Sequence, residues 1–287
     1  MISIVIISRN EGSELAATVE SLRQTTPRDE REIIVVDDAS TDGSADFLAE
    51  VSEVRLIRSE GIGVARARNL GASHAAGEVI VFCDGHVRAP AGWHIPMLRA
   101  LRNPATGACA PMVYSVTDPA KRGYGLYFTG AGLHTNWHAK RPADVTEVAV
   151  LPGCFLAIRR EVFEAIGGLD PGMRQLGGND TELSFRLWTF GFRPAVVPDV
   201  EVSHLFRTQV PYEATWTSVI HNRLRMAMVH FETPRIARVV DALSAYRHFP
   251  AGVALLADGD HGQKRIAVAK QRKFDDAWYF SNFGLEC

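Results

Sequence analysis

The chain has 287 residues, which corresponds to about two domains of average size or to one large α/β unit. Its 31 Lys and Arg residues nearly balance its 33 Asp and Glu residues, for a net charge of −2. A general nucleic-acid binder carries a basic excess, so we expect no nucleic acid as a partner. With 46% hydrophobic and 22% charged residues, the composition also excludes a disordered chain.

Neither a membrane segment nor a secretion signal is expected. No apolar run approaches the roughly 18 residues of a transmembrane helix, and the first residues lack the basic start and cleavage site of a signal peptide. The four cysteines are far apart and form no CxxC pair, which argues against a zinc ribbon or a disulfide scaffold. These features predict a cytoplasmic protein.

The first half of the chain alternates predicted strands with predicted helices. Apolar strands without strict alternation, joined by helices, indicate a parallel sheet covered on both faces. Such sheets bind ligands at the carboxyl ends of their strands. The expected strands are residues 3–8, 32–36, 54–57 and 78–83, and the expected helices begin at Ser13 as N-cap and then cover 44–51 and 63–75.

The second half is more irregular, and residues 103–150 are expected to form loops and short strands. We predict helices over 93–101, 160–166, 181–190 and 215–231, and strands over 155–159 and 195–197. The tail from residue 235 is mixed and ends in an aromatic stretch over 278–283. No repeat or low-complexity linker interrupts the chain, which favours one domain with a C-terminal extension.

Two carboxylates, Asp37 and Asp38, end the second predicted strand. In this position they can accept hydrogen bonds from a nucleobase or a ribose. They can equally belong to an Asx turn that caps the next helix, and the residues leave both interpretations open.

The triplet Asp84-Gly85-His86 follows the fourth predicted strand. A carboxylate and an imidazole at this spacing can reach one divalent ion, and Gly85 leaves room for a phosphate. An oxygen and nitrogen ligand set suits Mn²⁺ better than Mg²⁺. On the triplet alone, a turn aspartate with an exposed histidine is the favoured alternative.

Two later segments carry further polar candidates. Asp180 begins a predicted helix, where it can be an N-cap or, in a cleft, a general base. His204 and Arg207 follow a predicted strand and can serve as a metal ligand and a phosphate clamp, although a lone histidine is more often structural.

The order of these motifs resembles that of the GT-A glycosyltransferases of family 2, which join a nucleotide-diphosphate sugar to an acceptor. The resemblance covers roughly residues 2–210. It implies an α/β fold of the Rossmann-like GT-A type, with a mixed, mainly parallel sheet flanked by helices. It also implies a GT-A domain over 1–232, with a nucleotide half of about 1–102 and an acceptor half of about 103–232, followed by an extension over 233–287. The matching segments are residues 2–6, 10–11, 33–43, 67–71, 79–84, 153–170 and 179–180.

A narrower resemblance is to the polypeptide N-acetylgalactosaminyltransferases. Asp84, His86 and His204 match the three metal ligands of these enzymes, and residues 176–186 and 204–212 are similar to their WGGENLEISFR and HVFRKQHPY segments. The chain departs from them at Asn179-Asp180, where they have Glu-Asn. Inverting family 2 enzymes usually have Glu-Asp there, with the aspartate as the base.

The resemblance implies a site for a UDP-sugar donor and for Mn²⁺ or Mg²⁺. Asp180 would be the catalytic base, which takes the proton of an acceptor hydroxyl or thiol with inversion of the anomeric centre. Arg66 or Arg68 would face the diphosphate, but a salt bridge within the fold is the favoured alternative for either residue. Residues 205–214 are expected to form a lid. The expected nucleotide-sugar contacts are Ser8, Arg9, Asn10, Glu11, Asp37, Asp38, Arg68, Asp84, Gly85, Gly153, Gly178, Asn179, Arg207 and Tyr212.

Several alternatives stay open at this stage. One alternative is an enzyme that retains the anomeric configuration, as the GalNAc-transferases do, and another is a transferase that builds a polysaccharide or glycolipid. A third is a non-catalytic subunit that only binds a nucleotide sugar. The acceptor is expected to be a peptide, a protein or a glycan, and a homodimer is possible. A dinucleotide-binding oxidoreductase fits poorly, because Arg66 stands where the third glycine of GxGxxG belongs. A nucleotidyltransferase would show a glycine-rich loop after the first strand, which is absent.

Overall fold

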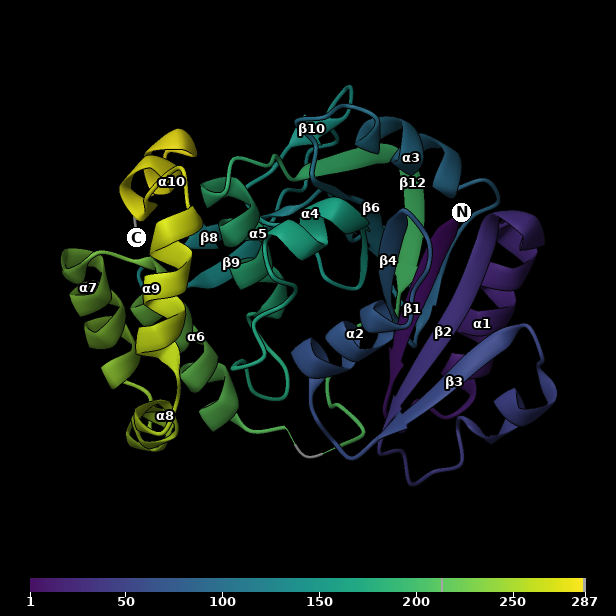
Figure 1. Ribbon diagram of the computed structural model, residues 1–287, viewed down its shortest axis with the longest axis horizontal. Helices are drawn as coiled ribbons and strands as arrows, with labels where there is room; N and C mark the ends of the chain where they lie inside the picture. The colour runs from purple at the N-terminus through teal and green to yellow at the C-terminus, as the bar shows by residue number, and fades with distance from the viewer. Residues whose placement is uncertain (213, 286–287) are drawn as a thin grey trace.

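A computed structural model describes residues 1–212 and 214–285 of the chain. Their strands form a ten-stranded mixed sheet and a separate hairpin. Along its main path the large sheet has the order β10-β12-β6-β11-β4-β1-β2-β3. The expected mixed, mainly parallel α/β sheet flanked by helices is confirmed (Figure 1).

The first half forms the parallel part of the sheet. β1 lies between β2 and β4 and pairs with both in parallel, and β3 pairs in parallel with β2. These strands are rich in Ile and Val, which suit a strand that is buried on both faces. Their bounds are β1 (Ile2–Ser8), β2 (Arg31–Asp38), β3 (Val54–Ser59) and β4 (Val79–Asp84).

Alternate side chains of these strands enter two separate hydrophobic cores. Leu15 and Val19 of α1 (Ser13–Thr25) share one core with Ile4 and Ile6 of β1. Residues of α2 (Val64–Ser73) share the other core with Val5. A Cβ atom on the α2 residue Gly71 would lie 2.2 Å from Cγ1 of Val5, so glycine permits the close approach of helix to sheet.

The second half adds strands of both directions. β11 (Phe155–Arg159) runs antiparallel to β4 and to β6 (Ala108–Ser115), and β12 (Ala195–His204) runs parallel to β6. The expectation of loops and short strands over 103–150 is therefore wrong for β6, which is an almost wholly buried core strand. β12 continues beyond residue 197 because a register shift between Val197 and Glu201 absorbs Pro198 and Asp199.

Two predicted helix starts also need correction. The segment predicted as a helix over 44–51 contains only the 3₁₀ helix η2 (Asp46–Glu50), because Asp42 holds the backbone N–H of Ser44 and of Gly12 in a turn. Ser13 is the first residue of α1 rather than its N-cap, which is Gly12 with φ of 57°.

The remaining elements are short strands, of which β8 and β9 form the separate hairpin, and helices, most of which lie in the second half. The strands are β5 (Val87–Arg88), β7 (Arg122–Gly123), β8 (Leu126–Thr129), β9 (His134–Trp137) and β10 (Thr146–Glu147). The helices are η1 (Arg28–Glu30), α3 (His94–Leu101), α4 (Arg160–Ala165), α5 (Asn179–Thr189), α6 (Trp216–His230), α7 (Thr233–Ser244), α8 (Phe249–Ala257), α9 (His261–Gln271) and α10 (Asp276–Asn282).

The C-terminal helices gather beside α6, on the side of the molecule away from β1, β2 and β3 (Figure 1). Tyr279 and Phe280 of α10 are buried in the core cluster that also holds Phe185 of α5. The Tyr279 hydroxyl donates to the carbonyl of Ala149 at 2.8 Å. None of the described helices has the length and apolar composition needed to cross a membrane.

A buried ionic group joins α5 to α6. Arg186 donates to both carboxylate oxygens of Glu182 at 2.8 Å, and His230 lies 2.9 Å from the same carboxylate. Burial by itself would raise the pKa of Glu182, but Arg186 and His230 hold that pKa well below its ordinary value. Glu182 is therefore ionised and acts as the counter-charge of Arg186 inside the core.

Replacing Glu182 with glutamine is expected to lower the free energy of unfolding by about 3–5 kcal/mol, because a buried guanidinium loses its counter-charge. Urea denaturation measures this change. The matched control is Glu161→Gln, which removes an exposed carboxylate paired with Arg159 and should cost no more than about 1 kcal/mol. Equal small effects of the two substitutions would contradict the structural role of Glu182.

Candidate active site

The carboxyl ends of β1, β4 and β12 open into a cavity of about 370 Å³. Ligand sites of α/β sheets occur at this edge. Most of the residues predicted to contact the nucleotide sugar line the cavity. These are Ser8, Arg9, Glu11, Asp38, Arg68, Asp84, Gly85, Gly153, Asn179 and Tyr212; the predicted base Asp180 and the predicted metal ligands His86 and His204 line it as well.

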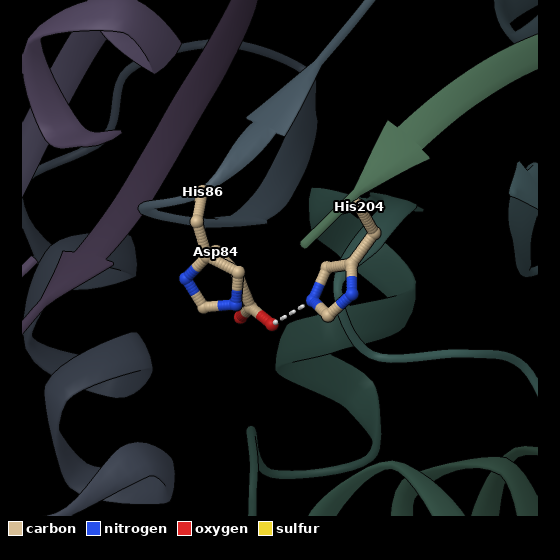
Figure 2. A group of neighbouring side chains, drawn as sticks. All are labelled: Asp84, His86 and His204. Atoms are coloured by element: carbon tan, nitrogen blue, oxygen red, sulfur yellow. Dashed lines mark ion pairs between the residues drawn. The ribbon is translucent and has the colours of Figure 1, made fainter. Parts of the chain in front are cut away.

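Asp84, His86 and His204 form one cluster within the cavity (Figure 2). One potential ligand atom of each residue lies within 4.8 Å of the others, and His204 Nε2 is 3.5 Å from Asp84 Oδ2. The His204 Nδ1 atom is buried and has no hydrogen-bond partner. One carboxylate and two imidazoles suit a divalent transition metal such as Mn²⁺, so these residues fit the predicted ion.

The carboxylate of this cluster is ionised. Burial would raise the pKa of Asp84, but a hydrogen bond from His204 and the positive charge of Arg68 hold it well below its usual range. An ionised carboxylate is the form that a metal ion binds. The acid of the Asp84-Gly85-His86 triplet is therefore in the form that a metal ion would bind at neutral pH.

Glu11 orients the cluster from the side of β1. Its Oε2 atom lies 3.0 Å from His86 Nδ1 and 2.6 Å from Arg207 Nη2. A carboxylate on one ring nitrogen fixes the imidazole for ligation through the other. Gly85 fits this contact, because a Cβ there would lie 2.8 Å from Cγ of Glu11. The structure places Arg207 on Glu11 and not among the cavity-lining residues.

Arg68 reaches the cavity from α2. It is only 5% exposed, and its Nη2 atom donates to Asp84 Oδ1 at 2.9 Å and to the carbonyl of Gly153 at 2.7 Å. The residue therefore combines the predicted salt bridge within the fold with a place in the cavity wall. Arg66 instead donates to the carbonyl of Pro171.

Asp180 is the second residue of α5 and not its cap, which is Gly178 with φ of 80°. Its carboxylate accepts from the backbone N–H of Gly153 at 3.2 Å and of Thr181 at 3.0 Å. Burial raises the pKa of Asp180, and the charge of Arg68 offsets part of this rise. A half-buried carboxylate with a raised pKa in a cavity wall has the properties of a general base.

Asn179, the neighbour of Asp180, also faces the cavity. It is 5% exposed, and its Oδ1 atom is buried without a hydrogen-bond partner. Gly178 lies outside the cavity lining. It adopts a left-handed backbone conformation at the start of α5, which glycine reaches without steric cost.

The two carboxylates at the end of β2 have separate roles. Asp37 accepts from the N–H of Ser40 at 3.1 Å and from Arg58 at 2.9 Å, and it does not line the cavity. Asp37 therefore belongs to a turn, as in the second interpretation, but it does not cap η2, which has no side-chain cap. Asp38 lines the cavity, although its oxygens accept from the backbone N–H groups of Ile62 and Gly63 at 2.7 and 2.8 Å.

The segment 205–212 of the predicted lid is joined to the loop after β1. Asn10, which has φ of 54° and does not line the cavity, donates through Nδ2 to the carbonyl of Pro211 at 3.1 Å. The Arg9 guanidinium lies 5.3 Å from the ring centroid of Tyr212. Residue 213 of the predicted lid is outside the described residues.

Aromatic side chains complete the cavity wall. Trp137 of β9 and Phe206 have ring centroids 6.1 Å apart, and the Phe206 ring lies 4.4 Å from that of His204. Phe206 is not among the site residues that the sequence predicts. Its position between His204 and Arg207 is the one sequence feature that marks it as a neighbour of the site.

The chain is similar to known glycosyltransferases. A family model described as "Glycosyl transferase family 2" matches residues 3–167. Polypeptide N-acetylgalactosaminyltransferase 10 of Mus musculus is 33% identical over 93% of this chain and 47% of its own length. Polypeptide N-acetylgalactosaminyltransferase 11 of Xenopus tropicalis is 34% identical over 98% of this chain and 50% of its own length. The chain thus spans about half the length of these curated relatives.

Solved structures show the same fold. A structure of GalNAc-T7 with UDP, GalNAc and Mn²⁺ superposes with a TM-score of 0.82 at 23% identity, over 99% of this chain and 56% of that one. A mannosyltransferase of Pyrobaculum calidifontis with GDP-Man and Mn²⁺ gives a TM-score of 0.56 at 20% identity, over 94% and 79% of the two chains. The fold is therefore that of the GT-A enzymes, and the chain belongs to glycosyl transferase family 2.

Proposed function

We propose that this chain is a metal-dependent glycosyltransferase that moves an N-acetylhexosamine or hexose from UDP to an acceptor hydroxyl or thiol. The observation that carries the proposal is that the Asp84, His86 and His204 cluster and the Asp180 carboxylate line one cavity. The names of the relatives support an N-acetylgalactosamine donor, and the solved structures in complex with nucleotides and Mn²⁺ support the class of ligand.

Asp84, His86 and His204 would hold Mn²⁺ or Mg²⁺ in this proposal. A bound divalent ion supplies Lewis-acid stabilisation of the diphosphate leaving group. The protein itself orients His86 through Glu11 and places the Arg68 guanidinium beside the same carboxylate. Asn179 offers the sugar an unpaired carbonyl oxygen that can accept from a hydroxyl or an N–H group.

Asp180 would act as the base that deprotonates the acceptor, with inversion at the anomeric carbon. Support comes from its place in the cavity wall and the raised pKa of its carboxyl group. Retention is the alternative, favoured by the similarity of the metal cluster to that of the GalNAc-transferases. The anomeric coupling constant of the product in a proton NMR spectrum distinguishes the two outcomes.

The acceptor in this proposal is a peptide or protein, with a glycan as the alternative. The names of the polypeptide transferases support the first choice. Trp137 and Phe206 provide an aromatic wall that can pack against an apolar side chain or a sugar ring.

The test is a donor screen with purified protein, Mn²⁺ and a panel of UDP- and GDP-sugars, in which released nucleotide and modified peptides are measured by mass spectrometry. The expected result is Mn²⁺-dependent release of UDP, with UDP-N-acetylgalactosamine among the best donors. Binding of UDP-sugars without any turnover would instead support a non-catalytic binding subunit. No binding of any nucleotide sugar would overturn the proposal.

Truncating Tyr212 to alanine is expected to weaken donor binding roughly 2- to 30-fold, because the ring that packs over Arg9 at the cavity wall is lost. Isothermal titration of UDP in the presence of Mn²⁺ measures the change. Val210→Ala is the matched control, since Val210 lies in the same segment, is 40% exposed and does not line the cavity. Equal affinities of the two variants would remove Tyr212 from the donor site.

A further inference from the structure

Arg223 on α6 lies against a histidine and a tyrosine rather than against a carboxylate. Its Nη1 and Nη2 atoms are 3.3 and 3.2 Å from the Nε2 and Nδ1 atoms of His134. His134 Nε2 is also 2.9 Å from the Tyr246 hydroxyl. A neutral imidazole has one acceptor nitrogen, so its ring can accept at most one of the five guanidinium N–H groups. Arg223 therefore keeps donors that this group of three residues does not use.

The neighbouring buried arginines differ from Arg223 in having counter-charges. Arg225, two residues along α6, donates to Asp170 at 2.7 and 2.8 Å and pairs with Asp260 at 2.8 Å. Arg223 is half-buried, and in residues 1–212 and 214–285 it forms no ion pair with a carboxylate. Burial lowers the pKa of Arg223. A cation that is partly removed from water without a counter-charge favours the binding of an anion.

This group of residues is close to the cavity. His134 lies on β9, and Trp137, three residues along the same strand, lines the cavity. At about 3.3 Å per strand residue, the two backbone positions are roughly 10 Å apart, and their side chains leave opposite faces of the strand. The helix that carries Arg223 begins at Trp216, shortly after the segment that covers the cavity. An acceptor of several residues that passes around this strand is long enough to extend from the cavity to Arg223.

We propose that Arg223, His134 and Tyr246 form a binding site for an oxyanion, a carboxylate or a phosphate group, on the acceptor. The planar guanidinium can donate two parallel hydrogen bonds to such a group, and the tyrosine hydroxyl can donate another. That the anion belongs to an acceptor rests on the proposed glycosyl transfer. The binding of an anion to these three residues does not depend on that transfer.

The first experiment measures anion binding without any turnover. The whole protein, labelled with ¹⁵N in its histidine rings, is titrated with sodium phosphate and separately with sodium acetate at constant ionic strength. The His134 ring signal is assigned from its loss in His134→Gln. We expect a saturable shift of this signal with at least one of the anions, and the anion that causes it identifies the group as phosphate or carboxylate.

The variants make this result specific. Arg223→Gln is expected to abolish the saturable shift, and Arg223→Lys, which keeps the charge, to restore part of it. The matched control is Arg238→Gln, which removes an exposed arginine of α7 and should leave the shift unchanged. No saturable shift in the unmodified protein, or the same shift in a folded Arg223→Gln or Tyr246→Phe variant, would overturn the proposal.

The second experiment tests the role of the anion in acceptor choice. Peptide acceptors that differ only by Asp against Asn, or by phosphoserine against serine, are compared as substrates. We expect Arg223→Gln to raise the KM for the anionic peptide at least about tenfold and to leave kcat/KM for the neutral peptide unchanged. Equal losses on both peptides contradict an acceptor role. If no peptide or glycan is modified at all, the proposed function fails, whereas the titration still decides whether the anion site exists.

Discussion

Asp180→Asn is expected to reduce sugar transfer by about 10²–10⁴-fold, the usual contribution of a general base. The substitution keeps the size of the side chain and its ability to accept from the N–H of Gly153, but it removes the negative charge that takes the proton. UDP binding should stay within about twofold of that of the unmodified protein, because Asp180 is predicted to act on the acceptor. Steady-state kinetics and titration calorimetry with UDP and Mn²⁺ measure the two quantities.

Asp118→Asn is the matched control for this variant, because it changes a partly exposed aspartate that is paired with Lys121 and lies outside the cavity wall. It should transfer sugar at the normal rate. Full activity of Asp180→Asn would remove Asp180 as the base. The anomeric configuration of the product decides between inversion and the alternative of retention.

His204→Ala is expected to raise the Mn²⁺ concentration needed for half-maximal activity at least about 10- to 100-fold. Losing a residue that only positions a metal ligand lowers metal affinity by about this factor, and His204 is itself a predicted ligand. The substitution leaves the ion pair of Asp84 with Arg68 in place, so the sheet edge keeps its charge balance. The measurements are the metal dependence of transfer and direct titration of Mn²⁺.

The control is His138→Ala, since His138 is an exposed histidine outside the cavity wall. It should leave the metal requirement unchanged. Chelation of the ion with EDTA is expected to stop transfer, and added Mn²⁺ to restore it. An unaltered Mn²⁺ requirement in His204→Ala would exclude His204 from the ligand set.

The parallel half of the fold was predictable from sequence because its strands are long, apolar and punctuated by helices. The carboxyl-end rule then placed Asp38, Asp84 and the loop after β1 at one sheet edge, as the structure has them. His204 joined them in the prediction only through the resemblance to known enzymes. Local patterns hold no information on how β12 is placed beside β6, more than 80 residues away in sequence.

The errors have local physical causes. Pro198 and Asp199 interrupt the apolar pattern of β12, so the strand was predicted to end before the bulge that accommodates them. The sequence leaves Asp37 open between a nucleotide contact and a turn, and it does not show that Arg58 of the next strand pairs with the Asp37 carboxylate. The pairing of Glu11 with Arg207 joins residues 196 positions apart and has no signature in either segment.

The order of the strands along the chain determines when the cluster of Asp84, His86 and His204 can form. Asp84 and His86 leave the ribosome early, whereas His204 is made much later and joins them where β12 pairs with β5, with His204 opposite Val87. Until then a growing chain presents two of the three side chains. In the proposed function, metal binding would therefore stabilise only the completed site and shift the folding equilibrium of the whole chain.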